Sequence, residues 1–164
     1  YEDITDRIEV EVSRFLTKTG TEAGDERMSE RIRGMISIIG DLERVGDILF
    51  QMSKGIERKA DEKLWFTPEQ RQNLLAMLQL TDTAFHVMLR NLDADNDGVK
   101  LDEAMEIEQR INQQRDTLRR AHFKSVESGD HNIKSGLVYN DLFNSCEKLG
   151  DHLINVSEAL TGMV

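Results

Sequence analysis

The sequence predicts an all-α protein, an antiparallel bundle of five long helices. Long stretches repeat apolar residues at alternating spacings of three and four, the period of an amphipathic helix, and no stretch reads as a strand. The chain holds a single proline, Pro68, and glycines gather between the periodic stretches. These observations predict helices at about 1–18, 26–60, 68–92, 100–127 and 131–162.

The boundaries of these helices rest on local start and stop signals. The third helix is expected to begin at Thr67-Pro68, because proline is favoured at the first helical position and a threonine before it can cap the helix. Gly20 and Gly24 are expected to interrupt the chain after the first helix, and residues 128–130 (Ser-Gly-Asp) form the last connection.

Composition limits the class of protein. A length of 164 residues fits one domain spanning 1–164. The single cysteine, Cys146, is typical of a reducing compartment and is expected to be a small core residue. No apolar run reaches the length of a membrane span, so we expect no direct membrane insertion by this segment. The net charge of -10 disfavours a nucleic acid partner and favours cations.

Two of the predicted helices carry matching apolar stripes. Each member of the second stripe lies 104 positions after its counterpart in the first, as the pair Met35 and Tyr139 shows. Such regular spacing is typical of helices that pack in a bundle. The first stripe is Met35, Ile38, Leu42, Val45, Leu49, Met52 and Ile56, and the second is Tyr139, Leu142, Cys146, Leu149, Leu153, Val156 and Leu160.

Polar residues repeat as well, which indicates an internal duplication. Residues 42–47 (Leu-Glu-Arg-Val-Gly-Asp) match 146–151 (Cys-Glu-Lys-Leu-Gly-Asp), and Ile4 to Ile8 resembles Ile107 to Ile111 at a displacement of 103. We therefore divide the chain into repeat one, 1–62, with two helices, and repeat two, 67–164, with three.

Repeat one lacks a counterpart of the helix at 68–92. Tyr1 is followed at once by a helical pattern, so we expect the sequence to begin inside a longer polypeptide, downstream of that missing helix. Without the missing helix, part of the apolar surface of repeat one is uncovered, which favours a homodimer.

Each repeat carries a pair of acids four residues apart, Glu43 with Asp47 and Glu147 with Asp151. This spacing places both carboxylates on one face of a helix, where they can chelate a hard cation. The alternative is that they are ordinary surface groups in loose ion pairs worth under about 1 kcal/mol. A glycine precedes each Asp, and glycine within a helix is unfavourable, so the pattern indicates a close helix approach beside each pair.

The string at residues 42–47 resembles the Leu-Glu-Arg-Ile-Gly-Asp motif of the PhoU phosphate-response proteins, whose two three-helix repeats each carry a Glu-x-x-x-Asp motif. The second repeat keeps Glu147, Gly150 and Asp151, but Lys148 replaces the usual arginine. The opening stretch from Tyr1 to Val12 looks like the PhoU-like C-terminal domain of sodium/phosphate (Na/Pi) cotransporter family proteins.

The resemblance implies a PhoU-like, spectrin-repeat-like bundle on the cytoplasmic side of a transporter that belongs to the same polypeptide. It implies a regulatory role in phosphate transport or homeostasis and metal ions of the iron, zinc or manganese type at Glu43, Asp47, Glu147 and Asp151. Two alternatives stay open: a free-standing PhoU regulator of a phosphate-importing ATPase and a sensor kinase, and a structural helical adaptor without a ligand.

An acidic stretch in the third connection gives only a weak indication of calcium binding. Asp93, Asp95 and Asp97 open like a calcium-binding EF-hand loop, but Lys100 and Ala104 stand where an aliphatic residue and a bidentate Glu belong, so calcium is not expected there.

The histidines form no metal motif either. None of them follows a Glu by three residues, and His152 is expected at the surface. No nucleophile with its base and no phosphate-cradling glycine loop is visible, so we do not expect an enzyme. The histidines are His86, His122, His131 and His152.

Overall fold

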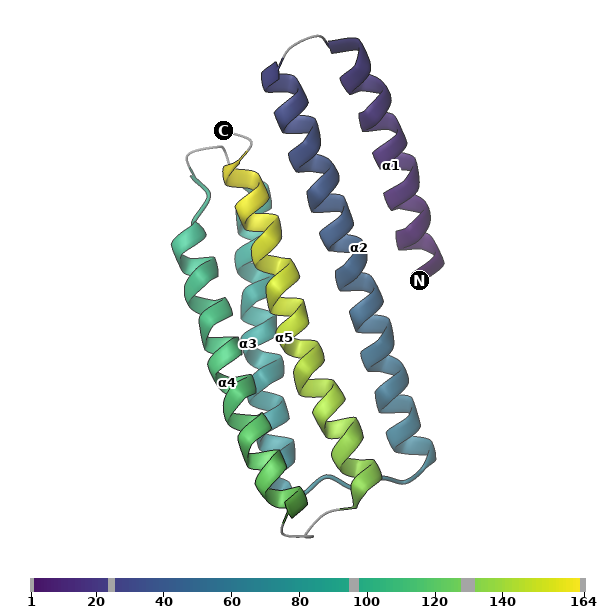
Figure 1. The fold of residues 1–164 in the computed structure, drawn as a ribbon, viewed down its shortest axis with the longest axis vertical. Helices are drawn as coiled ribbons and strands as arrows, with labels where there is room; N and C mark the ends of the chain where they lie inside the picture. The colour runs from purple at the N-terminus through teal and green to yellow at the C-terminus, as the bar shows by residue number, and fades with distance from the viewer. Residues whose placement is uncertain (1, 24–25, 95–97, 128–131, 163–164) are drawn as a thin grey trace.

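The described part of the chain forms five α-helices. The structure, a computed structural model, describes residues 2–23, 26–94, 98–127 and 132–162. No strand occurs among them, which confirms the all-α prediction (Figure 1). The helices are α1 (Glu2–Ala23), α2 (Glu26–Asp61), α3 (Pro68–Asp93), α4 (Leu101–Glu127) and α5 (Ile133–Thr161).

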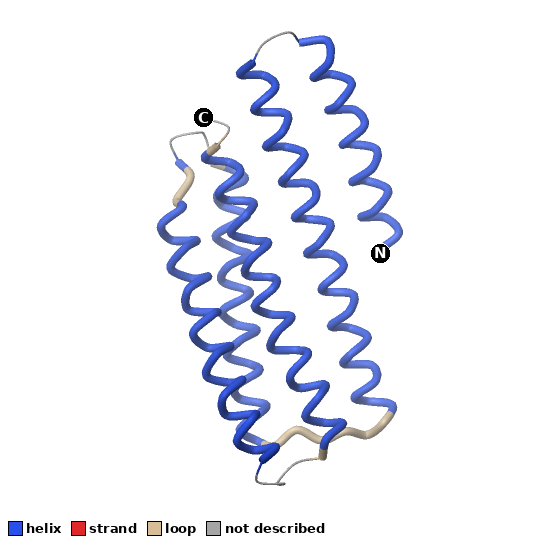
Figure 2. Tube along the Cα trace, in the orientation of Figure 1, coloured by secondary structure: helices blue, strands red, loops and turns tan. Residues whose placement is uncertain are grey.

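Successive helices run in opposite directions, and α5 occupies the centre of the bundle (Figures 1 and 2). It packs against α2, α3 and α4, while α3 and α4 also pack on each other. Helix α1 packs against α2 at the outer edge. No described helix combines the length and the apolar character that a membrane span requires.

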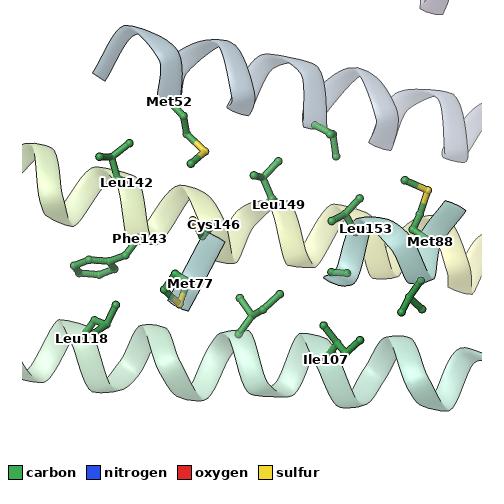
Figure 3. Close-up of a cluster of buried hydrophobic side chains, with 14 of the residues drawn as sticks. Met52, Met77, Met88, Ile107, Leu118, Leu142, Phe143, Cys146, Leu149 and Leu153 are labelled. Carbon is green, nitrogen blue, oxygen red and sulfur yellow. The ribbon is translucent and has the colours of Figure 1, made fainter. Parts of the chain in front are cut away.

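The core is built around the apolar stripe of α5. All of its members from Tyr139 to Val156 are buried, and Leu160 packs against the cluster from its edge. Figure 3 shows Met52 of α2 on one side of α5 and Ile107 and Leu118 of α4 on the other. Cys146 is fully buried, as expected from the sequence, and this burial raises the pKa of its thiol to about 11.

The start of α3 follows the sequence prediction. The Thr67 side chain accepts a hydrogen bond from the backbone N–H of Gln70, and the Gln70 side chain accepts one from the N–H of Thr67. Pro68 occupies the first turn. This reciprocal arrangement satisfies backbone donors that the first turn of a helix leaves unpaired.

The end of α1 differs from the prediction. We expected it near residue 18, with Gly20 in a loop, but the helix continues to Ala23. Gly20 lies inside the helix, where a Cβ would sit 3.2 Å from Cδ1 of Ile32 on α2. The glycine therefore permits a close contact between the two helices instead of ending the first. Three other expectations concern residues outside the described part of the chain. They are the calcium-loop residues Asp95 and Asp97, the connection at 128–130, and His131.

The two matched stripes are not equally buried. On α2, Ile38, Val45 and Met52 belong to the core, but Leu49 and Ile56 are exposed. The expectation that every member of this stripe packs in a bundle was therefore wrong for two of them. The reason is that α3 and α4 cover α5, whereas α1 is the only described helix on the corresponding side of α2.

The close approaches expected at the paired glycines are present. A Cβ on Gly46 would lie 3.3 Å from Oγ1 of Thr5 on α1, and a Cβ on Gly150 would lie 3.1 Å from Cδ1 of Ile111 on α4. Each acidic pair thus stands beside a close contact with a neighbouring helix.

These contacts predict opposite effects for two glycine substitutions. Gly150→Val should destabilise the protein by roughly 1–3 kcal/mol, because the added atoms collide with buried Ile111. Gly40→Ala should stabilise it by up to about 1 kcal/mol, because no atom lies within 4 Å of the new Cβ and alanine favours the helix. Urea unfolding followed by circular dichroism measures both, and equal effects would contradict the close approach.

Candidate metal centre

Helices α1 and α2 bring three carboxylates together. One oxygen from each of Asp6, Glu43 and Asp47 can be chosen so that all three lie within 4.8 Å of one another. Glu43 and Asp47 are one turn apart on α2, as their spacing predicted. Asp6 comes from α1, and the sequence interpretation did not include it.

The contact between Gly46 and Thr5 positions the third carboxylate. Because Gly46 has no side chain, α1 can approach α2 at this level, and Asp6 is the next residue after Thr5. The available signal in the sequence was an acid in the first helix opposite the glycine. It was obscured because the repeat alignment pairs Asp6 with Gln109, which is not acidic.

The charges of the triad, meaning Asp6, Glu43 and Asp47, repel one another. Burial raises the pKa of Glu43 above its ordinary value, and repulsion from Asp47 and from Asp6 raises it further. Arg44 opposes this shift, although its Nε lies 3.8 Å from Oε2 of Glu43 and its side chain is largely exposed. A cation bound between the three oxygens would relieve this repulsion.

The second acidic pair, Glu147 and Asp151, has different neighbours. Arg115 of α4 places Nη2 2.9 Å from Oε1 of Glu147, and both side chains are largely shielded from solvent. Burial raises the pKa of Glu147, as does Asp151, while Arg115 lowers it. Within the described parts of the chain, no group of three metal-binding side chains of this closeness includes Glu147 or Asp151.

Asp151 faces an acidic groove between α4 and α5. Its pKa is raised first by burial and then by the charge of Glu108. Both residues line the groove, which has a volume of about 870 Å³ and is also lined by Asp102, Glu106 and Glu158. Glu147 therefore lies beside an arginine, and Asp151 lies in the groove. Within the described residues, no third carboxylate joins them in the geometry of the triad.

No described histidine belongs to the triad. His152, expected at the surface, is partly buried between α5 and α2, where its Nδ1 lies 2.8 Å from Oδ1 of Asp41. The same oxygen accepts a hydrogen bond of 3.1 Å from Nδ2 of Asn155. His122 packs against the rings of Tyr139 and Phe143. These contacts give His122 and His152 structural roles.

No protein-family model, no curated protein and no solved structure matches the chain, so these comparisons assign it to no family.

The raised pKa of Glu43 predicts how stability responds to pH. The folded state holds the Glu43 proton more tightly than the unfolded chain, so ionisation of Glu43 costs stability as pH rises above about 4.5. Glu43→Gln should therefore raise the melting temperature of metal-free protein at pH 7, and this gain should vanish near pH 4.

Calorimetry in a chelator across this pH range measures the effect. Glu30→Gln is a matched control, since Glu30 is exposed on the same helix. The difference in melting temperature between this variant and the wild-type protein should not change with pH in this way. A constant gain from Glu43→Gln at every pH would contradict charge repulsion as the cause.

Proposed function

We propose that the chain is a regulatory, metal-binding PhoU-like domain that acts in phosphate transport or phosphate homeostasis as the cytoplasmic part of an Na/Pi cotransporter. The observation that carries the proposal is the convergence of Asp6, Glu43 and Asp47. Two of these acids belong to the string at residues 42–47 that resembles the PhoU motif.

The donor set favours some metals over others. Three carboxylate oxygens suit hard cations, among which manganese and iron fit better than zinc, because zinc prefers nitrogen and sulfur ligands. Three side chains also leave coordination positions for water or for an oxygen of phosphate. We propose that these open coordination positions link the metal centre to phosphate.

The arrangement of the helices supports a duplicated architecture. We propose that α1 and α2 form one pseudo-repeat and α3, α4 and α5 the other, with the first lacking a counterpart of α3. The glycine contacts support this division, since Gly46 meets α1 and Gly150, at the matching position, meets α4.

A regulatory mechanism follows from the way α1 is held. A cation shared by Asp6 and the two α2 carboxylates would join α1 more firmly to α2. Helix α2 packs along α5 and is linked to it through Asp41 and His152. Metal occupancy would therefore favour one packing of α1 on the bundle, and a transporter that contacts α1 would respond to it.

Metal binding tests the site directly. Titration calorimetry with manganese should show binding to the purified protein that Asp6→Asn or Asp47→Asn weakens at least about tenfold, because each removes one charged ligand. Glu147→Gln should have little effect, since Arg115 already neutralises Glu147. Binding that persists in both triad variants, or that depends on Glu147 instead, would contradict the assignment.

Phosphate uptake tests the function. Cells that carry Glu43→Gln in the natural gene should take up radiolabelled phosphate at an altered rate across low and high external phosphate, while Glu30→Gln cells should match the wild type. Loss of metal binding in Glu43→Gln protein together with unchanged uptake would contradict the regulatory role and favour a structural adaptor.

A further inference from the structure

One side of α1 carries three large apolar side chains that are exposed, with Glu11 between the last two. Ile4, Ile8 and Phe15 follow the spacing i, i+4 and i+11, which places them on one side of the helix, and they are 56%, 54% and 67% exposed. Such a stripe of large apolar side chains in water is unusual for a helix that has no further partner.

The second repeat shows the same stripe in a covered state. The residues 103 positions later on α4 are Ile107, Ile111 and Leu118, and they are 5%, 0% and 2% exposed. The residue types correspond closely, so the difference in exposure comes from how neighbouring helices pack on α1 and α4 and not from their sequences.

The helices that partner α1 and α4 show the same contrast. Leu49 of α2 is 44% exposed, whereas its counterpart Leu153 of α5 is 2% exposed. Ser53 is exposed and bonds to the carbonyl of Phe50 on its own helix, whereas its counterpart Ser157 is buried and accepts a hydrogen bond of 3.0 Å from Nδ2 of Asn91 on α3.

Helix α3 contributes to these differences, together with the direct contact of Ile111 with α5 at Gly150. Helix α3 packs against both α4 and α5 and buries Met77, Ala84, Val87 and Met88 in the shared core. None of the described helices stands in the corresponding place on α1 and α2. We call this uncovered surface the α1–α2 seat and define it by Ile4, Ile8, Phe15, Leu49 and Ser53.

We propose that the α1–α2 seat binds one amphipathic helix of the same kind as α3, which has 26 residues and buries one apolar face against its neighbours. The repeat supplies the reason for choosing a single helix, because the matched surface of α4 and α5 accommodates one. Continuity with an existing interface supports it as well, since Leu49 lies beside Val45 and Met52, which are buried in the core that α2 shares with α5.

The seat and the metal centre lie on different sides of α1. Asp6 is two residues after Ile4, which places it about 200° around the helix and on the opposite face. A docked helix would therefore leave the triad accessible. The two sites can be tested independently, and the seat does not depend on the proposed role in phosphate transport.

A peptide with the sequence of residues 67–93, labelled with fluorescein, serves as the probe. Titration with the full chain should give a saturable rise in fluorescence anisotropy and a gain in peptide helicity. Phe15→Glu and Leu49→Glu should each weaken binding at least about tenfold, because each replaces a buried apolar contact with a charge. Both residues are exposed in the free chain, so these variants should fold.

Two controls separate the seat from other surfaces. Phe123→Glu changes an exposed aromatic residue of α4 that lies outside the seat and should leave binding unchanged. In the presence of a chelator, Asp6→Asn should also leave peptide binding unchanged, because the variant alters the triad and not the seat. Equal weakening by Phe123→Glu, or no saturable binding, would overturn the proposal.

Sedimentation of the chain alone distinguishes a second copy of the protein from a helix. The proposal predicts that any self-association through the seat is competed by the peptide. A dimer that dissociates in Phe15→Glu but resists the peptide would overturn the proposal in favour of a second copy as the occupant.

Discussion

Burial of the apolar stripe of α5 against three neighbouring helices is the constraint on which the rest of the structure depends. Its apolar residues face three neighbouring helices, so α2, α3 and α4 are each fixed by contact with the same central stripe. Helix α1 does not share this arrangement, because it reaches the bundle through α2. The bundle is thus firmly held around α5 and more weakly held at the edge, and both proposed sites involve the edge.

The two acidic pairs show how one local design leads to different chemistry. In each case a glycine allows a neighbouring helix to approach beside a Glu-x-x-x-Asp pair. At the first pair the approaching helix supplies Asp6, which adds negative charge and favours a cation. At the second it supplies Arg115, whose guanidinium already neutralises Glu147. The two pairs therefore share a close glycine contact but differ in whether an external cation is needed to balance their charge.

Both proposed ligands would act on α1. A cation at the triad would connect α1 to α2 through charge, and a helix in the α1–α2 seat would cover the apolar face of α1. Each would reduce the freedom of α1 to move on α2, so occupancy of one site would favour the other even though they lie on opposite faces. Through this coupling, metal binding at the triad would change the affinity of α1 for a neighbouring protein segment.

The sequence by itself determined the five helices, the cap at Thr67, the buried stripe of α5 and the pairing of Glu43 with Asp47, because all of these follow from periodicity and local hydrogen bonding. Only the tertiary structure decided which residues of other helices arrive beside them. The repeat alignment pairs Ile8 with Ile111, yet Gly46 meets Thr5 where Gly150 meets Ile111, a difference of three residues or about 4.5 Å along the helix. This stagger brings Asp6 to one pair while Arg115 reaches the other, and it depends on packing between helices that no local pattern records.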